Sequence, residues 1–362
     1  FGSSLGVSRV PIGHCPRWIG RAARRGASAV LPRWLRLGGL FCPNMLRMLS
    51  VRSGRAPRLT WRHCGKLVAM TEPEPRSLAD FEVNFRAALG TGTCGSVYSG
   101  LHRDTHREVA IKVVSPALPS ASNEELAIGV AQETQVFEQV LQACESHPHV
   151  VDLLGCFQGP SSEATQLGLE VPEEAAEEPL HYFVMERLSG ESLADRIERE
   201  KGLEEKAAKE ATRSICEGLS FLHGQGIVHR DVKPANVLYT PEASESDLKL
   251  IDFSHSGIVP DSEDLNSRCL QSTLGTAGYV APEVLAGREP YSAKCDVYSL
   301  GCTVHAMLAG GRLPRRHPRL GIMTSLPESA SPEASNFLDS LLSPTPELRP
   351  TIHEVLSSSW LQ

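Results

Sequence analysis

Two short polar stretches, each bordered by apolar residues, constrain this chain more than any other feature. The first reads VHRDVKPANVL at 228–238, and the second reads LKLIDFS at 248–254. They place Asp231, Asn236 and Asp252 on two loops between β-like segments. Phosphoryl transfer from ATP needs this set, because one Asp orients the attacking hydroxyl while an Asn and a second Asp hold magnesium. His-Arg-Asp alone would indicate a solvated charged turn, but the spacing of the other two residues favours the chemical interpretation.

A glycine-rich segment lies upstream, at 90–95, with the pattern Gly-x-Gly-x-x-Gly. The residues after it predict two strands, over 96–100 and 108–114, joined by a polar turn. A dinucleotide-binding fold would begin a helix there instead. Glycines in such a hairpin let backbone N–H groups approach phosphates, because no Cβ intervenes. Lys112 lies in the second strand, and its Val-Ala-Ile context disfavours a plain surface lysine.

Regular patterns continue beyond this hairpin. Apolar residues at helical spacing predict a helix over 124–145. A second, strongly amphipathic helix is predicted over 203–223, and it ends before glycines that suit a left-handed cap. The apolar run 182–186 predicts a buried strand. Just before it, the polar segment 159–179 ends in several glutamates and is expected to be a mobile, solvated acidic insertion.

The N-terminal segment has a different composition from the rest. The first 71 residues contain no Asp or Glu and are rich in Arg, Gly, Ser and Pro. Such a composition cannot bury enough apolar surface to fold, so residues 1–77 are predicted to be disordered. The composition is also typical of an organelle transit peptide, or else translation starts at Met45, Met48 or Met70. We expect a cytoplasmic protein, with a plastid or mitochondrial location as the alternative.

Bulk composition excludes several classes of protein. With 362 residues and 41% hydrophobic content, the chain is long enough for two lobes with a core. The formal charge of −7 conceals a clearly acidic remainder after the Arg-rich segment, which argues against nucleic acid as a partner. The ten cysteines show no Cys-x-x-Cys and no metal-ligand spacing, so reduced thiols are expected. No apolar run approaches about 18–20 residues, so no membrane span is predicted.

Taken together, the motifs resemble those of eukaryotic protein kinases of the serine/threonine type. The stretch 229–236 is similar to the catalytic loop His-Arg-Asp-x-x-x-x-Asn, and 252–254 is similar to Asp-Phe-Gly with Ser in place of Gly. The stretch 274–283 (LGTAGYVAPE) is similar to the end of an activation segment, and the whole resemblance covers about 80–361. The run 190–197 and the closing residues most resemble the calcium/calmodulin-dependent kinase-like group. No EF-hand loop or basic amphipathic tail supports direct control by calcium or calmodulin.

The resemblance implies a fold and an activity. The implied fold is α+β with two lobes: a small β-rich N-lobe over 78–186 with one regulatory helix, and a larger, mainly helical C-lobe over 187–362. The implied activity is transfer of the γ-phosphate of ATP, with Mg²⁺, to Ser or Thr hydroxyls of protein substrates. A pseudokinase or scaffold that binds nucleotide without efficient transfer is the alternative. A monomer is expected, with an upstream activating kinase as a further partner.

The resemblance also implies roles for the residues that match the family's motifs. Asp231 is the catalytic base, and Lys233 stabilises the transferred charge. Asn236 and Asp252 are the metal ligands, and Asn236 also counts as catalytic. Arg230 could receive a phosphate placed on Ser272 or Thr273 of the activation segment. Thr276 would sit beside the catalytic Asp and help to select a hydroxyl acceptor.

The nucleotide site follows from the same resemblance. Lys112 holds the α- and β-phosphates and pairs with a glutamate, for which Glu133 is preferred and Glu138 is the alternative. Met185 guards the back of the adenine pocket, and the backbone of 186–188 bonds the purine. The expected nucleotide-binding residues are Leu89, Gly90, Thr91, Gly92, Thr93, Cys94, Gly95, Val97, Ala110, Lys112, Glu133, Met185, Glu186 and Leu188.

Three features depart from the family pattern. Ser254 replaces a glycine and should stiffen that turn by favouring negative φ, which leads us to expect altered switching with the chemistry retained. Ala235 stands where many basic-directed kinases have Glu, which weakens any case for arginine before the target serine. The segment 310–320 is short and lacks the usual Pro-Phe, which puts substrate docking there in doubt. Elsewhere the pattern holds, and Arg349 is expected to pair with Glu283.

Overall fold

The computed structural model describes residues 59–61, 67–69, 77–92, 95–114, 123–143, 146–171, 178–240, 247–259, 264–266, 270, 274–287, 290–317 and 321–362. The chain divides into one unit over Phe1–Arg58 and a second over Leu59–Gln362. The first unit, with most of the segment expected to be disordered, lies outside the described residues. Within that segment, β1 (Leu59–Trp61) and β2 (Leu67–Ala69) pair antiparallel. These six residues differ from the expectation of disorder, because branched and aromatic side chains among them favour strands.

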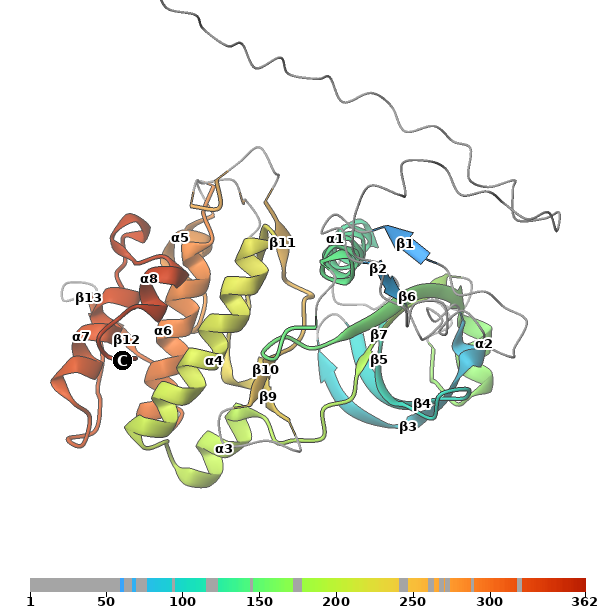
Figure 1. The fold of residues 1–362 in the computed structure, drawn as a ribbon, viewed down its shortest axis with the longest axis horizontal. Helices are drawn as coiled ribbons and strands as arrows, with labels where there is room; N and C mark the ends of the chain where they lie inside the picture. The colour runs from blue at the N-terminus through green and yellow to red at the C-terminus, as the bar shows by residue number, and fades with distance from the viewer. Residues whose placement is uncertain are drawn as a thin grey trace, which may run out of the picture. The chain divides into compact units, whose positions relative to one another are not determined.

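Five antiparallel strands form the N-lobe sheet, in the order β3-β4-β5-β7-β6 (Figure 1). The strands are β3 (Phe81–Gly92), β4 (Gly95–His102), β5 (Glu108–Val114), β6 (Leu153–Pro160) and β7 (Pro179–Glu186). The hairpin of β3 and β4 carries the glycine segment. β4 pairs with β5 from Ser96↔Val113 to Leu101↔Glu108 without a register shift. The predicted strand–turn–strand is therefore confirmed.

One long helix, α1 (Asn123–Gln142), packs against this sheet. It confirms the helix predicted over 124–145. Phe137 of α1 is buried against Phe183 of β7, with ring centroids 5.3 Å apart. This contact fixes the helix on the sheet and also fixes Glu133, which lies one turn earlier on the same face.

The segment between β6 and β7, expected to be a mobile acidic insertion, is structured in its first part. Helix α2 (Ser161–Gln166) follows β6 directly, and its Ala164 is fully buried. Leu169 and Val171 pack on the same N-lobe core. The expectation was wrong for 159–171, because a few isolated apolar residues show no periodic pattern and yet suffice to cover the sheet. Most of the segment's glutamates lie outside the described residues.

The C-lobe is mainly helical (Figure 1). Its helices are α3 (Leu193–Glu200), α4 (Glu205–Gly224), α5 (Pro282–Ala286), α6 (Lys294–Leu308), α7 (Pro332–Leu341) and α8 (Ile352–Leu356). Short 3-10 helices lie at Leu78–Asp80, Pro234–Asn236 and Pro346–Leu348. Helix α4 confirms the amphipathic helix predicted over 203–223, because Ala211, Ile215 and Leu219 are buried on one face. The two-lobed α+β fold is as expected.

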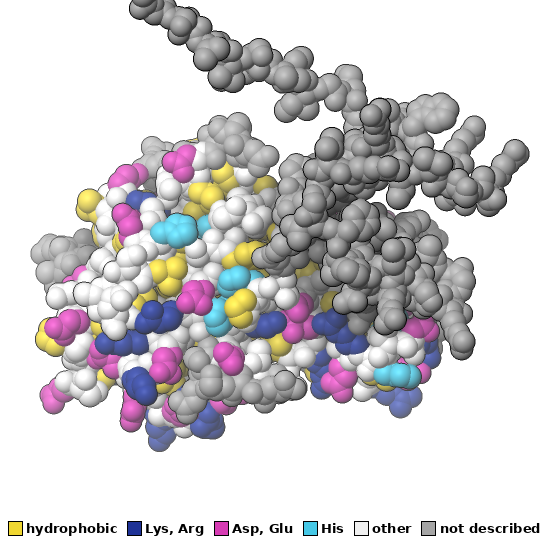
Figure 2. All heavy atoms as spheres, viewed as in Figure 1, with side chains coloured by type: hydrophobic (Ala, Val, Ile, Leu, Met, Phe, Trp, Pro, Cys, Tyr) yellow, Lys and Arg dark blue, Asp and Glu magenta, His cyan; other side chains and the backbone are white. Residues whose placement is uncertain are grey.

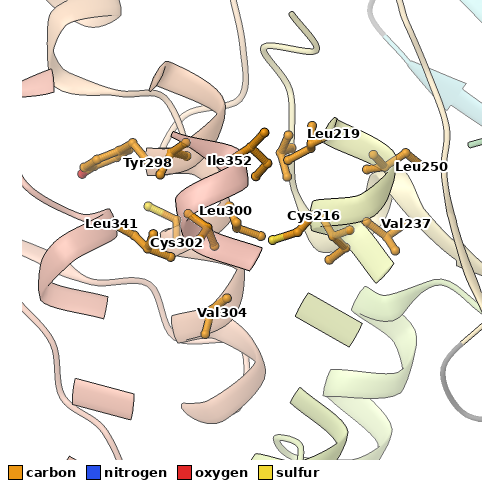
Figure 3. Close-up of a cluster of buried hydrophobic side chains, with 14 of the residues drawn as sticks. Cys216, Leu219, Val237, Leu250, Tyr298, Leu300, Cys302, Val304, Leu341 and Ile352 are labelled. Atoms are coloured by element: carbon orange, nitrogen blue, oxygen red, sulfur yellow. The ribbon is translucent and has the colours of Figure 1, made fainter. Parts of the chain in front are cut away.

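Helices α4 and α6 contribute the centre of the C-lobe core. Figure 3 shows side chains of α4, α6, α7 and α8 gathered in one cluster with Val237 and Leu250. All residues of α6 from Cys295 to Leu308 are buried. Polar groups on such a helix have to find partners inside the protein. Two of them, Asp296 and His305, hold the loops that build the site.

Two short strand pairs frame the loops that carry the motif residues. The strands are β8 (Ile227–Val228), β9 (Val237–Tyr239), β10 (Leu248–Leu250) and β11 (Gly257–Ile258). β9 pairs with β10, and β8 pairs with β11, both antiparallel. The loops 229–236 and 251–256 therefore lie side by side, as their β-like borders predicted.

A small hairpin lies between α6 and α7, where β12 (Arg315–His317) pairs with β13 (Gly321–Met323). His305 of α6 bonds both sides of it. Nδ1 of His305 lies 2.7 Å from the carbonyl oxygen of Arg312, and the backbone N–H of Ser325 donates to Nε2 at 3.2 Å. A carbonyl oxygen only accepts, so Nδ1 carries the proton and the ring is neutral. Burial lowers the pKa of His305, although the bond to the Arg312 carbonyl opposes this shift.

Lowering the pH should weaken this anchor. The unfolded chain takes up a proton at His305 near pH 6.5, before the folded protein does, so the free energy of unfolding falls as the pH drops below about 6.5. His305→Gln removes this contribution and keeps a donor and an acceptor. We expect the stability difference between the wild type and the variant, measured by urea unfolding, to shrink between pH 7.5 and about pH 5.5. A difference that stays constant would show that His305 is not held neutral.

Candidate active site

Asp231 is a buried carboxylate with several donors around it. Its side chain is 1% exposed. Oδ1 accepts from the backbone N–H of Thr276 at 3.0 Å and from the Thr276 hydroxyl at 2.6 Å. Oδ2 accepts from Nζ of Lys233 at 2.8 Å and from Nδ2 of Asn236 at 2.9 Å. Burial alone would raise the pKa of Asp231, but the bonds from Lys233 and Thr276 hold it below its usual value. The carboxylate is therefore ionised and fixed in place.

Lys233 and Thr276 close a triangle with Asp231. Nζ of Lys233 also donates to the Thr276 hydroxyl, at 2.6 Å. That hydroxyl gives its own proton to Asp231 and so accepts from Lys233. The triangle ties the end of the activation segment to the catalytic loop. It also places an ammonium group beside the carboxylate.

Asn236 and Asp252 retain oxygen atoms of the kind that magnesium prefers. Asn236 donates its amide nitrogen to the carbonyl and the carboxylate of Asp231. Asp252 accepts with Oδ1 from Lys112 and from the backbone N–H of Ser254, at 3.1 and 3.3 Å. Burial would raise the pKa of Asp252, but the Lys112 charge holds it well below its usual range. The backbone N–H of Ile251 donates to the Asn236 carbonyl at 3.0 Å, so the two residues lie on adjoining loops. An ionised carboxylate and an amide oxygen are ligands that fit Mg²⁺.

Lys112 connects the sheet, helix α1 and the loop 251–256, which carries Asp252. Its Nζ lies 2.6 Å from Oε1 of Glu133 and 3.1 Å from Oδ1 of Asp252. Burial alone would lower the pKa of Lys112, but Asp252 and Glu133 overcome this effect and raise it. The structure thus brings together three residues that lie far apart in the sequence. It selects Glu133 over Glu138, which is exposed.

The glycines of the glycine-rich segment lie at the end of β3 and the start of β4. Gly90 pairs with Val97, and Gly92 pairs with Gly95. A Cβ at Gly95 would lie 2.3 Å from the carbonyl oxygen of Val113, and the φ of Gly95 is +140°, so this position needs glycine. A Cβ at Gly90 would meet nothing within 4 Å. Thr93 and Cys94, two of the expected nucleotide-binding residues, lie outside the described residues.

The remaining residues expected at the nucleotide site lie on neighbouring strands. Ala110 of β5 pairs with Met185 of β7, and Leu89 is 50% exposed. At the hinge, the backbone N–H of Glu186 donates to the Asp152 carbonyl at 2.9 Å. The backbone N–H of Glu186 is therefore taken by a bond within the protein.

The Glu186 side chain has a role that the sequence did not indicate. Its Oε1 accepts from the backbone N–H of Asp152 at 2.7 Å and from Nζ of Lys249 at 2.5 Å. Lys249 lies on β10, next to the loop 251–256. Glu186 therefore links the hinge to the C-lobe. The missed signal was a charged residue, Lys249, inside an otherwise apolar strand.

Asp296 holds the backbone of the catalytic loop. It is fully buried at the start of α6. Its Oδ2 accepts from Nε2 of His223 and from the backbone N–H of His229, both at 2.9 Å, and its Oδ1 accepts from the backbone N–H of Arg230 at 2.7 Å. Arg230 has a φ of +63°, so this residue is held in a conformation that non-glycine residues rarely adopt.

The Arg230 guanidinium bonds groups within the protein. Nε donates to the His255 carbonyl at 2.5 Å, and Nη2 donates to the Ser256 carbonyl at 2.7 Å. Nη1 lies 3.3 Å from the hydroxyl of Tyr291. Ser272 and Thr273, the expected phosphate sites, lie outside the described residues, so that hypothesis stays a prediction.

Ser254 fits its turn without backbone strain. Positive φ occurs at Asp252, at +63°, and Ser254 is not among the non-glycine residues with positive φ. The serine hydroxyl lies 3.3 Å from Nδ1 of His255, which itself lies 3.6 Å from Oδ2 of Asp231. His255 is a neighbour of the catalytic carboxylate that sequence reasoning missed, although its position directly after the Asp-Phe-Ser motif was visible.

Arg349 and Glu283 form the expected structural pair. Nη1 and Nη2 of Arg349 donate to the two carboxylate oxygens of Glu283, at 2.6 and 2.8 Å. The Arg349 side chain is fully buried and also lies over the ring of Tyr298. The pair ties helix α5, at the end of the activation segment, to the last part of the C-lobe.

Comparison with known proteins assigns the family. The model of the protein kinase domain matches residues 83–361, and the chain belongs to this family. Members of this family in general use ATP and Mg²⁺ and act on protein substrates. Among the described residues, no helix is long and apolar enough to cross a membrane.

Several relatives are similar over the same region. The hormonally up-regulated neu tumor-associated kinase homolog A of Xenopus laevis is 32% identical over 287 residues, covering 75% of this chain and 37% of that protein. The corresponding kinase of Homo sapiens is also 32% identical, and 35% of it is covered. Ribosomal protein S6 kinase alpha-4 of Mus musculus is 29% identical over 316 residues, covering 81% of this chain and 36% of that protein. The chain thus spans little more than a third of the length of these relatives.

Proposed function

We propose that this chain is an active protein serine/threonine kinase that transfers the γ-phosphate of ATP to Ser or Thr hydroxyls. The observation that carries the proposal is the complete set of contacts around Asp231, joined to the Lys112–Glu133–Asp252 cluster. An inactive relative has no need to keep a buried carboxylate, a lysine and an amide aligned on one point. The kinase names of its relatives agree with this proposal.

The residues divide the work of the reaction between them. Asp231 accepts a hydrogen bond from the acceptor hydroxyl and directs its lone pair toward the phosphorus. Its lowered pKa makes Asp231 a weak base, which suits a transition state in which the proton leaves late. Lys233 faces the same space and stabilises the charge on the group being transferred. Asn236 and Asp252 would hold magnesium, which when bound would neutralise part of the phosphate charge.

Lys112 and the glycine-rich segment position the nucleotide. Lys112 offers a fixed ammonium to the α- and β-phosphates, and Glu133 prevents it from turning wholly toward Asp252. The glycine-rich segment would offer backbone N–H groups to the same phosphates. Thr276, bonded to both Asp231 and Lys233, favours a small aliphatic hydroxyl acceptor, which is the basis for proposing Ser and Thr.

Three finer assignments belong to the same proposal. The run 190–197 and the end of the chain favour the calcium/calmodulin-dependent kinase-like group. We also propose a cytoplasmic monomer. The pseudokinase alternative rests on Ser254 alone, and the negative φ that serine favours agrees with the geometry of this turn.

The test is transfer of labelled phosphate from ATP with magnesium, by the full chain, to one acidic and one basic generic protein. Amino-acid analysis of the product should show phosphoserine and phosphothreonine without phosphotyrosine. Lys112→Met should lower the rate by about 10²-fold or more, because Glu133 and Asp252 lose their shared cation and the phosphates lose their anchor. Nucleotide binding without transfer, in protein also pre-treated with an activating kinase, would favour the pseudokinase.

A further inference from the structure

Two positions beside the catalytic loop offer no free carboxylate to a basic residue of a substrate. Ala235, two residues after Lys233, is exposed and carries no charge. Glu191 lies close by, since its carbonyl accepts from the backbone N–H of Tyr239 just past the loop. Both carboxylate oxygens of Glu191 are taken by Arg199, at 2.6 and 3.2 Å. Neither position therefore offers a free acid to a basic side chain of a substrate.

The segment after α6 lies against the end of the activation segment. Gly278 comes so close to Leu313 that a Cβ there would lie 2.6 Å from Cδ1 of Leu313. Gly278 is only two residues beyond Thr276, whose hydroxyl bonds Asp231. The residues that flank Leu313 therefore lie next to the place where the acceptor residue must bind. Its charged neighbours in the sequence are Arg312 and Arg315.

Arg312 and Arg315 are exposed, and neither forms an ion pair within the described part of the chain. Nε of Arg312 donates to the Ala309 carbonyl at 2.9 Å, which orients the guanidinium and leaves its outer N–H groups for a ligand. His305 holds the Arg312 carbonyl and so fixes the backbone of this segment. A pre-oriented guanidinium loses little freedom when it binds a carboxylate.

The sequence around these arginines is unusual for this chain. Beyond residue 71 there are 43 Asp and Glu against 23 Lys and Arg, yet 297–327 contains no acid and four arginines. On the face drawn in Figure 2, basic and acidic side chains are instead interspersed. A local positive field on an otherwise acidic protein attracts anionic segments of a substrate. The field repels few residues of the protein itself, because most of its charged residues are acidic.

From these contacts we propose that Arg312 and Arg315 recognise acidic side chains of the substrate close to the phosphorylated Ser or Thr. The inference rests on the proposed kinase function and adds the substrate class. Arginine suits this role because its planar guanidinium can bind a carboxylate through two parallel hydrogen bonds. The short hairpin, whose docking role the sequence left in doubt, becomes the specificity element.

The experiment uses peptides with one serine acceptor and four kinds of flanking residue: neutral, Glu before the serine, Glu after it, and Arg on both sides. The wild-type full chain is compared with Arg315→Glu and with the double variant Arg312→Ala/Arg315→Ala. Lys206→Glu serves as a charge-matched control, because Lys206 is an exposed residue of α4. We expect one of the Glu peptides to exceed the neutral peptide about tenfold in kcat/KM, mainly through KM. Both arginine variants should remove this preference and leave the neutral peptide nearly unchanged. High salt should reduce it, because the site is exposed.

Binding of the same labelled peptides, measured by fluorescence anisotropy, separates this inference from the kinase proposal. A Glu preference in binding that depends on the arginines, without any transfer, would refute the proposed kinase activity and support recognition of acidic residues by Arg312 and Arg315. Transfer to the neutral or Arg peptide with no Glu preference would refute only this recognition of acidic residues. A Glu preference that survives in the double variant would also refute it, and the absence of both binding and transfer would refute both proposals.

Discussion

Asp231→Asn is expected to lower kcat for phosphoryl transfer by about 10²–10⁴-fold and to leave MgATP binding largely intact. In the proposed mechanism this carboxylate accepts the hydrogen bond of the substrate hydroxyl. An amide at this place offers one oxygen in place of two, and its NH₂ group faces the donors that surround Asp231. The residues proposed to bind the nucleotide, Lys112, the glycine segment and Asp252, are unchanged in this variant, so the affinity for MgATP should change little.

The measurement is single-turnover transfer from labelled ATP, beside nucleotide binding and thermal unfolding of the same samples. Asp104→Asn serves as the matched control, because Asp104 is exposed in the turn after β4. If Asp231→Asn binds nucleotide, stays folded and still transfers phosphate within a few-fold of the wild-type rate, Asp231 does not orient the acceptor. If the free energy of unfolding falls by about as much as the activation free energy of transfer rises, the slower rate comes from loss of the hydrogen bonds among Asp231, Lys233 and Thr276.

Much of the site could be predicted because its residues lie on short loops with fixed spacing. The β-like borders of the two polar stretches place Asp231, Asn236 and Asp252 together, and the structure brings them together. Lys112 and Glu133 come from other elements, 21 residues apart in the sequence. Periodicity alone gave a helix with two candidate glutamates, and only packing of Phe137 on the sheet decided between them.

Other features depend on contacts that no local pattern shows. The bonds of Arg230 to two carbonyl oxygens come from the course of the chain after Asp252, and backbone acceptors have no sequence signal. His305 appears in the sequence as one more residue of an apolar helix, although it anchors a hairpin. Helix α2 is too short to show helical periodicity in the sequence. Ala164 is buried because this helix packs on the N-lobe core. Burial and hydrogen bonding across the fold override local composition at these places.

Asp296→Asn is expected to destabilise the C-lobe by about 3 kcal/mol and also to lower kcat. Asp296 accepts from one imidazole N–H and two backbone N–H groups, all of them buried. An asparagine keeps one oxygen, and its NH₂ group must face at least one of these donors. A buried donor left without an acceptor costs about 1–3 kcal/mol, and Asp296 is fully buried.

The effect on the rate comes from backbone strain in the catalytic loop. Arg230 is held at a φ of +63°, a conformation that costs about 1–2 kcal/mol for a residue with a Cβ. Its backbone N–H bonds Oδ1 of Asp296 at 2.7 Å, and that bond opposes relaxation. Once it weakens, Arg230 can return to negative φ and move the next residue, Asp231. A displacement of about 1 Å at the acceptor is enough to slow transfer by about 10²-fold.

Thermal unfolding and kcat should therefore both change in Asp296→Asn, whereas Asp231→Asn should mainly change kcat.

The dependence of stability on pH adds a second measurement. Burial would raise the pKa of Asp296, but the bond from His223 holds it below its usual value. The Asp296 carboxylate thus contributes stability above about pH 4, and this contribution is lost as the pH falls through the pKa of the folded protein. The difference in free energy of unfolding between the wild type and Asp296→Asn should therefore narrow only below about pH 4. If the variant keeps both its melting temperature and its rate, the β8–β11 pairing and the Arg230 guanidinium hold the loop without Asp296. The catalytic geometry would then depend on the strand frame and not on the buried helix.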